Sequence, residues 1–155
     1  EHSICICRGA LVSTAIQYSH STVIDREAIA LLVYRFYDEV RADPRLGPSF
    51  EAVLADHWAT HLPRMVEFWS TLVLSTRSFS GNVFSKHMAL DGITPQHFER
   101  WLTLWFATTG RLFSAPVAER FQTMALGIAR NIHRGYFNDD ADFARITAGL
   151  RHAGH

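Results

Sequence analysis

Apolar side chains recur every three or four residues along most of this chain, and few stretches alternate apolar with polar residues. Spacing of three or four places side chains on one face of an α-helix, whereas alternation is typical of strands. The first clear series of apolar residues at helical spacing follows Asp25, a residue type that caps helices. This series ends at Asp43-Pro44. The pattern predicts an all-α protein with about five main helices.

Residues that break helices locate the next elements. Leu46-Gly47-Pro48 is typical of a tight corner, which leads to Phe50. A second helix is predicted over residues 56–74, where apolar side chains again repeat at helical spacing. Pro63 falls inside this range, and a proline there removes a helical hydrogen bond. We therefore expect the helix to begin near Thr60 or to kink at the proline.

The second half of the chain continues the helical pattern. Residues 75–82 are mostly polar and predict a loop, and residues 84–90 predict a short helix. Thr94-Pro95 starts a further helix, because threonine can cap it and proline fits its first position. The last long helix carries an apolar stripe over residues 117–132.

Size and composition favour one packed domain. The chain has 155 residues, of which 48% are hydrophobic, so a single core is feasible. We place this domain at residues 24–137, after an N-terminal extension over 1–23. A polar C-terminal tail over 138–155 follows, in which 142–150 favour a short helix. The 15 basic and 15 acidic residues balance, which argues against nucleic acid or an anionic membrane as a partner.

The cysteines and the lengths of the apolar runs indicate the cellular compartment in which the protein is expected. Cys5 and Cys7 are separated by one residue, and in an extended segment they lie at the distance limit for a disulfide. Nothing in this pattern demands an oxidising environment. No apolar run reaches the roughly 18 to 20 residues that span a bilayer. We therefore expect a cytoplasmic protein without a membrane partner.

His87 is the residue that most suggests chemistry. It lies among apolar neighbours, Phe84, Met88 and Leu90, in a chain with 11 Phe and 4 Trp. Such a neutral imidazole suits the proximal ligand of a haem iron, and aromatic side chains suit the walls of a haem pocket. The absence of a Cys-x-x-Cys-His motif indicates that any haem is held without covalent attachment. The alternative is a histidine at the surface or one satisfied within the core.

Three further side chains could donate hydrogen bonds to a ligand of the iron. Tyr37 and Trp101 lie on apolar helix faces and carry one donor each. His61 follows Trp58 by three residues on the second predicted helix. The alternatives are that the tyrosine and tryptophan bind backbone carbonyls and that His61 is solvated.

Two other classes of site fit poorly. His57 and His61 are four residues apart and could share a zinc ion on one helix face. Trp58 occupies the position where a zinc protease needs glutamate, however, and no third ligand completes the site. A serine hydrolase is disfavoured because no Gly-x-Ser-x-Gly motif is present.

Several motifs occur in a fixed order along the chain: Phe36-Tyr37-Asp38-Glu39-Val40-Arg41, Leu46-Gly47-Pro48-Ser49-Phe50, Trp58-Ala59-Thr60-His61, Phe68-Trp69, Lys86-His87-Met88-Ala89-Leu90 and Arg100-Trp101-Leu102. Together, over about Ile24 to Phe137, they resemble the group III, or P-class, truncated haemoglobins. The sequence also lacks any Gly-Gly pair, in agreement with group III.

The resemblance implies a truncated globin fold, a two-over-two helical sandwich around haem b. His87 is then the proximal ligand of the iron, and Tyr37, His61 and Trp101 stabilise a ligand on the distal side. It also implies the walls of the haem pocket: Phe50, Met65, Phe68, Trp69, Phe84 and Phe98.

A polar distal site bears on function, because several donors slow the release of dioxygen. The resemblance therefore implies redox use of the bound gas, in nitric oxide dioxygenation or in peroxide chemistry, with an unidentified reductase as partner. Dioxygen, nitric oxide and carbon monoxide are the expected ligands of the iron. A non-enzymatic sensor or buffer of oxygen or nitric oxide is the alternative, and a haem-free helical interaction domain is a further one.

Overall fold

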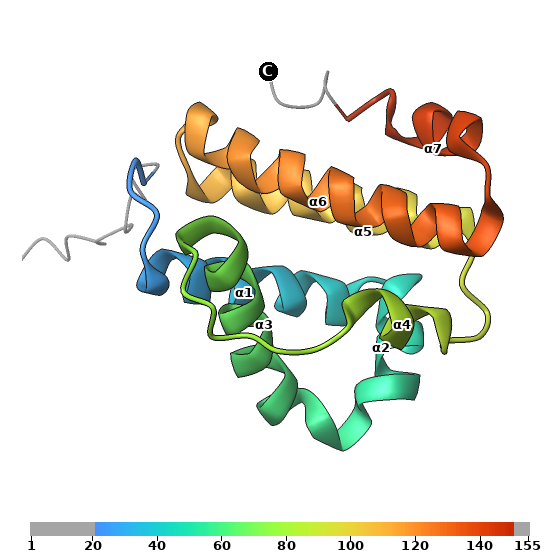
Figure 1. Cartoon of the computed structure of the whole chain (residues 1–155), viewed down its shortest axis with the longest axis horizontal. Helices are drawn as coiled ribbons and strands as arrows, with labels where there is room; N and C mark the ends of the chain where they lie inside the picture. Colours follow the sequence, from blue (N-terminus) through green and yellow to red (C-terminus); the bar gives the residue numbers. More distant parts are fainter. Residues whose placement is uncertain (1–20, 151–155) are drawn as a thin grey trace, which may run out of the picture.

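The computed structural model describes residues 21–150, which form two layers of paired helices. The first layer contains α1 (Arg26–Ala42) and α3 (Trp58–Leu74), and the second contains α5 (Pro95–Leu112) and α6 (Ala115–Phe137). In Figure 1 the α5–α6 pair lies above the α1–α3 pair. Contacts of α1 with α5 and of α3 with α6 join the layers, so the prediction of an all-α, two-over-two arrangement is confirmed.

Shorter elements complete the architecture. The helix α2 (Leu46–Leu54) and a 3-10 turn, Ala55–His57, lead from α1 to α3. A loop over residues 75–82 precedes α4 (Val83–Met88), as predicted, and α4 packs on α6. An isolated bridge also pairs Ser21 with Phe113 at the start of the described residues. The predicted arrangement of Cys5 and Cys7 lies outside them.

An aromatic core joins the four long helices. Trp105 of α5 is 1% exposed, and its ring contacts one aromatic ring from each of the other three helices. The centroid distances are 4.8 Å to Phe36 of α1, 4.4 Å to Trp69 of α3 and 6.4 Å to Phe121 of α6. Its indole N–H also donates to the Phe121 carbonyl at 3.1 Å. One buried ring therefore fixes the relative placement of both layers.

The corner after α1 is a helix, so the prediction of a simple tight turn was wrong. Asp43 supplies the reason: its buried carboxylate accepts hydrogen bonds from the N–H groups of Arg45 and Leu46, both at 2.9 Å, and so caps α2. Arg100 of α5 donates to the other carboxylate oxygen at 2.5 Å. Gly47 allows close approach here, because a Cβ atom would lie 2.7 Å from the Arg41 carbonyl oxygen.

The helix predicted over residues 56–74 is present as α3, which contains Pro63 and begins at Trp58 rather than near Thr60. The proline has no N–H, so the carbonyl of Ala59 lacks its usual helical donor. The preceding 3-10 turn, Ala55–His57, leads directly into the helix. The first turns of α3, which carry His61, therefore form despite a missing hydrogen bond.

The predicted short helix near the C-terminus is present as α7 (Asp140–Thr147), which lies across the ends of α5 and α6 (Figure 1). Phe143 and Ile146 of α7 are buried against these helices. His133 of α6 is fully buried, and its Nε2 lies 3.0 Å from Asp142 Oδ2. This segment therefore contributes to the core of the described chain.

We expect Asp43→Asn to lower the free energy of unfolding by about 1–3 kcal/mol at pH 7, because it weakens the hydrogen bonds of a buried charge. Burial opposes ionisation of Asp43, but hydrogen bonds from Leu46, Arg100 and Arg45 outweigh it and lower its pKa. The stabilisation should be complete above the ordinary aspartate pKa of about 3.9 and lost as the pH falls through the lower folded value.

Urea unfolding at pH 7 and at pH 3 measures both effects. Asp38→Asn is the control, because Asp38 is exposed on the same helix. Equal stability of Asp43→Asn and the wild-type protein at pH 7 would contradict the role of this carboxylate.

Candidate functional site

Four rings from three helices form a cluster that we call the distal cluster: Tyr37 of α1, Phe50 of α2, and Trp58 and His61 of α3. The Tyr37 ring lies 5.5 Å from the His61 ring, 5.8 Å from Trp58 and 6.1 Å from Phe50, in edge-to-face contacts. The structure therefore brings together two predicted ligand-stabilising residues, Tyr37 and His61, and one predicted wall residue, Phe50.

The Tyr37 hydroxyl is a donor without a protein partner within the described part of the chain. The residue is only 6% exposed, and burial raises the pKa of its hydroxyl. Tyr37 therefore stays protonated at neutral pH. Among residues 21–150 its contacts are with rings, and its hydroxyl makes no hydrogen bond. The hydroxyl oxygen is not one of the fully buried unpaired atoms among the described residues, so it is accessible and can donate to a molecule bound at the cluster.

His61 is half-buried and favours the neutral form. Burial lowers the pKa of His61, and the charges of Arg64 and His87 lower it further. A neutral imidazole offers one N–H donor and one acceptor.

His87 has the ring arrangement of a metal ligand. Its Nδ1 lies 2.7 Å from the carbonyl oxygen of Val83, one turn earlier on α4. A nitrogen this close to a carbonyl must carry the proton, so Nε2 carries the free lone pair. Nε2 makes no hydrogen bond to another described residue. Such a bond on the second nitrogen commonly fixes the tautomer of histidines that bind metals.

Two residues of α6 hold the segment that carries His87. The single hydroxyl proton of Tyr136 is shared between the carbonyl of His87 and, at 3.1 Å, that of Leu90. At Gly135 a Cβ atom would lie 2.7 Å from the Phe84 ring and 2.8 Å from the Met88 sulfur. Neither residue was singled out in the sequence. A glycine inside a helical stripe was the available signal, because such a glycine often has a packing reason.

Trp101 is connected to the distal cluster by Phe36, whose ring contacts both Trp101 and Tyr37. The Phe36 ring is 5.2 Å from Tyr37 on one side and 5.2 Å from Trp101 on the other. The Trp101 ring is parallel to that of Trp105, 5.5 Å away at 6°. Its indole N–H makes no hydrogen bond within residues 21–150, so it too is an available donor.

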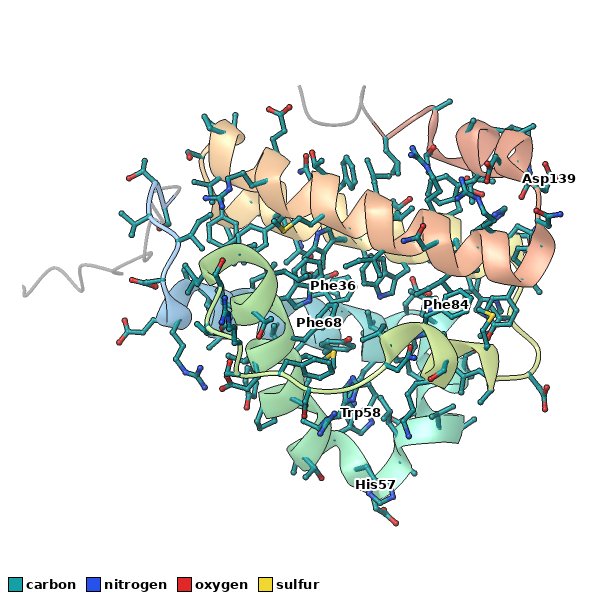
Figure 2. The ribbon with its side chains drawn as sticks, in the orientation of Figure 1. Phe36, His57, Trp58, Phe68, Phe84 and Asp139 are labelled. Atoms are coloured by element: carbon teal, nitrogen blue, oxygen red, sulfur yellow. The ribbon has the colours of Figure 1, made fainter. Side chains whose placement is uncertain are left out.

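Three of the predicted wall residues lie on the two elements that carry the histidines. Met65 and Phe68 are half-buried on α3, and Phe84 is 46% exposed on α4. Figure 2 labels Phe68 on α3 and Phe84 on α4. These side chains therefore lie on the elements that carry the predicted haem site.

The other two predicted wall residues make different contacts. Trp69 is stacked on Trp105 in the core. Phe98 packs against His133 at 5.3 Å, and against Tyr136 at 6.3 Å. Phe98 therefore supports the helix that holds α4.

The structure offers little support for a zinc site. His57 is exposed, and Figure 2 shows it at an outer corner of the molecule. In the part of the chain described here, no three histidine, cysteine, aspartate or glutamate side chains are placed to hold a metal ion.

Two hollows over α6 are a separate feature. They have volumes of about 440 and 410 Å³ and share Arg130 and Arg134. Arg134 is paired with Asp140 at 2.9 Å, and Arg130 lies over the Phe143 ring. Neither hollow is lined by a residue of the distal cluster or by His87. These cations already have partners, which leaves the distal cluster and His87 as the candidate site.

Comparison with known proteins agrees with this arrangement. No protein-family model matches the sequence. The group 3 truncated haemoglobin ctb of Campylobacter jejuni subsp. jejuni is 33% identical over 85 residues, spanning 53% of this chain and 67% of the relative. The crystal structure of the group III truncated haemoglobin from Campylobacter jejuni matches with a TM-score of 0.70 and 27% identity, covering 73% of this chain and 91% of that one.

Residues 21–150 contain no helix that is long and apolar enough to cross a membrane. The predicted truncated globin fold is confirmed by the structural match. The sequence match, 33% identical and covering 67% of the relative, shows the family as well as the fold. The chain belongs to the group III truncated haemoglobins.

Proposed function

We propose that this protein binds haem b and that His87 is the axial ligand of the iron. The observation that carries the proposal is the hydrogen bond between His87 Nδ1 and the Val83 carbonyl, which leaves the Nε2 lone pair available. The unpartnered Tyr37 hydroxyl supports it from the distal side. When bound, haem would supply an iron atom that can take a diatomic gas, and His87 would hold that iron. The pocket walls that we propose remain those predicted from the sequence.

The distal residues are suited to a polar ligand. Tyr37 is protonated because burial raises its pKa, so its hydroxyl can donate. His61 is neutral at pH 7 because burial lowers its pKa, and it offers one N–H. Trp101 offers an indole N–H. We propose that these donors hold dioxygen, which gains more from hydrogen bonds than the less polar carbon monoxide.

Strong retention of dioxygen suits a reaction better than transport. We propose that the protein combines dioxygen with nitric oxide and one electron to give nitrate, with the electron supplied by an unidentified reductase. Peroxide reduction is a related candidate, because the same donors would stabilise charge on a departing oxygen. A sensor or buffer of oxygen or nitric oxide needs the same haem site without the reductase.

His87→Ala tests the haem site directly. We expect this variant to lose haem or to hold it weakly, since it removes the proposed iron ligand. Soret absorbance and haem content after gel filtration are the measurements. His57→Ala is the matched control, because His57 is exposed and lies away from the site. Wild-type haem content in His87→Ala would refute the assignment.

Tyr136→Phe tests the support of the proximal segment. The variant removes the hydroxyl proton that is shared between the carbonyls of His87 and Leu90. We expect haem to be lost roughly two- to tenfold faster, which corresponds to about one net hydrogen bond. Transfer of haem to a scavenger protein gives this rate. Tyr34→Phe is the control, because Tyr34 is 47% exposed. Equal rates in both variants would contradict the role of Tyr136.

Tyr37→Phe tests the distal donors. We expect dioxygen to dissociate roughly five- to a hundredfold faster, because one hydrogen bond of about 1–3 kcal/mol is lost. Carbon monoxide binding should change little. Trp101→Phe should act in the same direction, although the two effects need not add. Stopped-flow displacement of dioxygen measures both. If neither variant releases it faster than the wild-type protein, these side chains do not face the ligand.

A further inference from the structure

Three side chains from three helices form a closed network on the distal side. The Trp58 indole N–H of α3 donates to Glu51 Oε1 of α2 at 2.9 Å. Arg41 of α1 donates through Nε to the same oxygen at 3.2 Å. The Arg41 guanidinium carbon also lies 4.7 Å from the centre of the Trp58 ring, a cation–π distance. Each member of the network therefore contacts the other two.

The network runs from the surface into the interior. The side chains of Arg41 and Glu51 are 46% and 45% exposed, whereas Trp58 is only 6% exposed. A buried indole N–H needs an acceptor, and Glu51 supplies it. The carboxylate therefore restricts the Trp58 ring to an orientation in which its N–H points outward.

The inner side of Trp58 contacts the proposed ligand-binding residues. Its ring lies 5.8 Å from Tyr37 and 6.1 Å from His61, in edge-to-face contacts, and it is stacked on Phe50 at 6.3 Å and 19°. His61 also follows Trp58 by one turn of α3. Rotation of Trp58 would remove packing from Tyr37 and His61 together.

We propose that Trp58 and Glu51 are positioning residues of the distal site. Glu51 fixes the Trp58 ring, and this ring holds Tyr37 and His61 in the orientation in which they donate to a diatomic ligand. Arg41 closes the network from outside. This inference rests on the proposed haem function, and it assigns Trp58 no contact with the ligand itself.

The chain provides a matched control for Glu51. Glu39 of α1 pairs with Arg111 at 3.0 Å, and the Glu39 side chain is 46% exposed, close to the value for Glu51. Among the described residues, no hydrogen bond joins the Glu39–Arg111 pair to the distal cluster. Glu39→Ala therefore removes a comparable surface ion pair without changing the support of Trp58.

The test uses the haem-loaded full chain and two readouts besides activity. The infrared C–O stretching band of the carbon monoxide adduct reports the orientation of nearby donors. NMR hydrogen exchange reports how firmly the Trp58 indole N–H is bonded. In Glu51→Ala we expect faster indole exchange, a broadened or split C–O band, and dioxygen release roughly two- to tenfold faster. In Trp58→Phe we expect the same changes in the C–O band and in release.

Glu51→Gln separates hydrogen bonding from charge and from folding. Its amide oxygen can still accept a hydrogen bond from the Trp58 indole, so we expect Glu51→Gln to show the wild-type C–O band. Glu51→Ala has no such acceptor, so we expect its band to change. Glu39→Ala should match the wild-type protein in every readout. If Glu51→Ala does not fold, the C–O bands of Trp58→Phe and Glu51→Gln are compared instead. A changed band in Trp58→Phe with a wild-type band in Glu51→Gln supports the proposal, and a wild-type band in both overturns it.

Two outcomes separate this inference from the proposed function. A wild-type C–O band and wild-type dioxygen release in both Glu51→Ala and Trp58→Phe, with the Soret band present, would overturn the positioning role alone. Absence of a Soret band in the wild-type protein would overturn the haem proposal and this inference with it.

Discussion

The packing of Trp105 is the interaction on which the rest of the structure depends. Its ring contacts one aromatic side chain from each of the other long helices: Phe36 of α1, Trp69 of α3 and Phe121 of α6. Large rings bury much apolar surface, and their contacts are directional, so a shift of any one helix would disturb several of them. The two layers are thereby locked in register without a sheet or a disulfide among the described residues.

This core also orients the distal side of the proposed site. Trp101 precedes Trp105 by about one helical turn and stacks on it, and Phe36 lies between Trp101 and Tyr37. The proposed donors Tyr37 and Trp101 are thus attached to the buried aromatic core. Binding groups built on packed helices hold their geometry better than groups on loops. The proximal side is built differently, because His87 lies on a six-residue helix whose support comes from Tyr136 and Gly135.

Local signals in the sequence account for what could be predicted. The caps at Asp25 and Thr94 and the helical spacing of apolar residues act over a few positions, so the main helices and their order follow from the sequence. The helix α2 was missed because Asp43 caps it as a buried charge, held by Arg100, which lies 57 positions away. Trp58 was noted only as part of a motif. Its pairing with Glu51 joins two helices, and apolar periodicity carries no information about such a contact.

The hydrogen bond that joins α4 to Tyr136 of α6 has a consequence for the order in which the molecule folds. The carbonyl of His87 is bonded to the hydroxyl of Tyr136, 49 positions later in the chain, and the polar loop before α4 cannot place it alone. The distal side is built from α1, α2, α3 and α5, all of which precede α6 in the chain, whereas the proximal side needs Tyr136 of α6. During synthesis, the segment carrying His87 would leave the ribosome well before the tyrosine that anchors it.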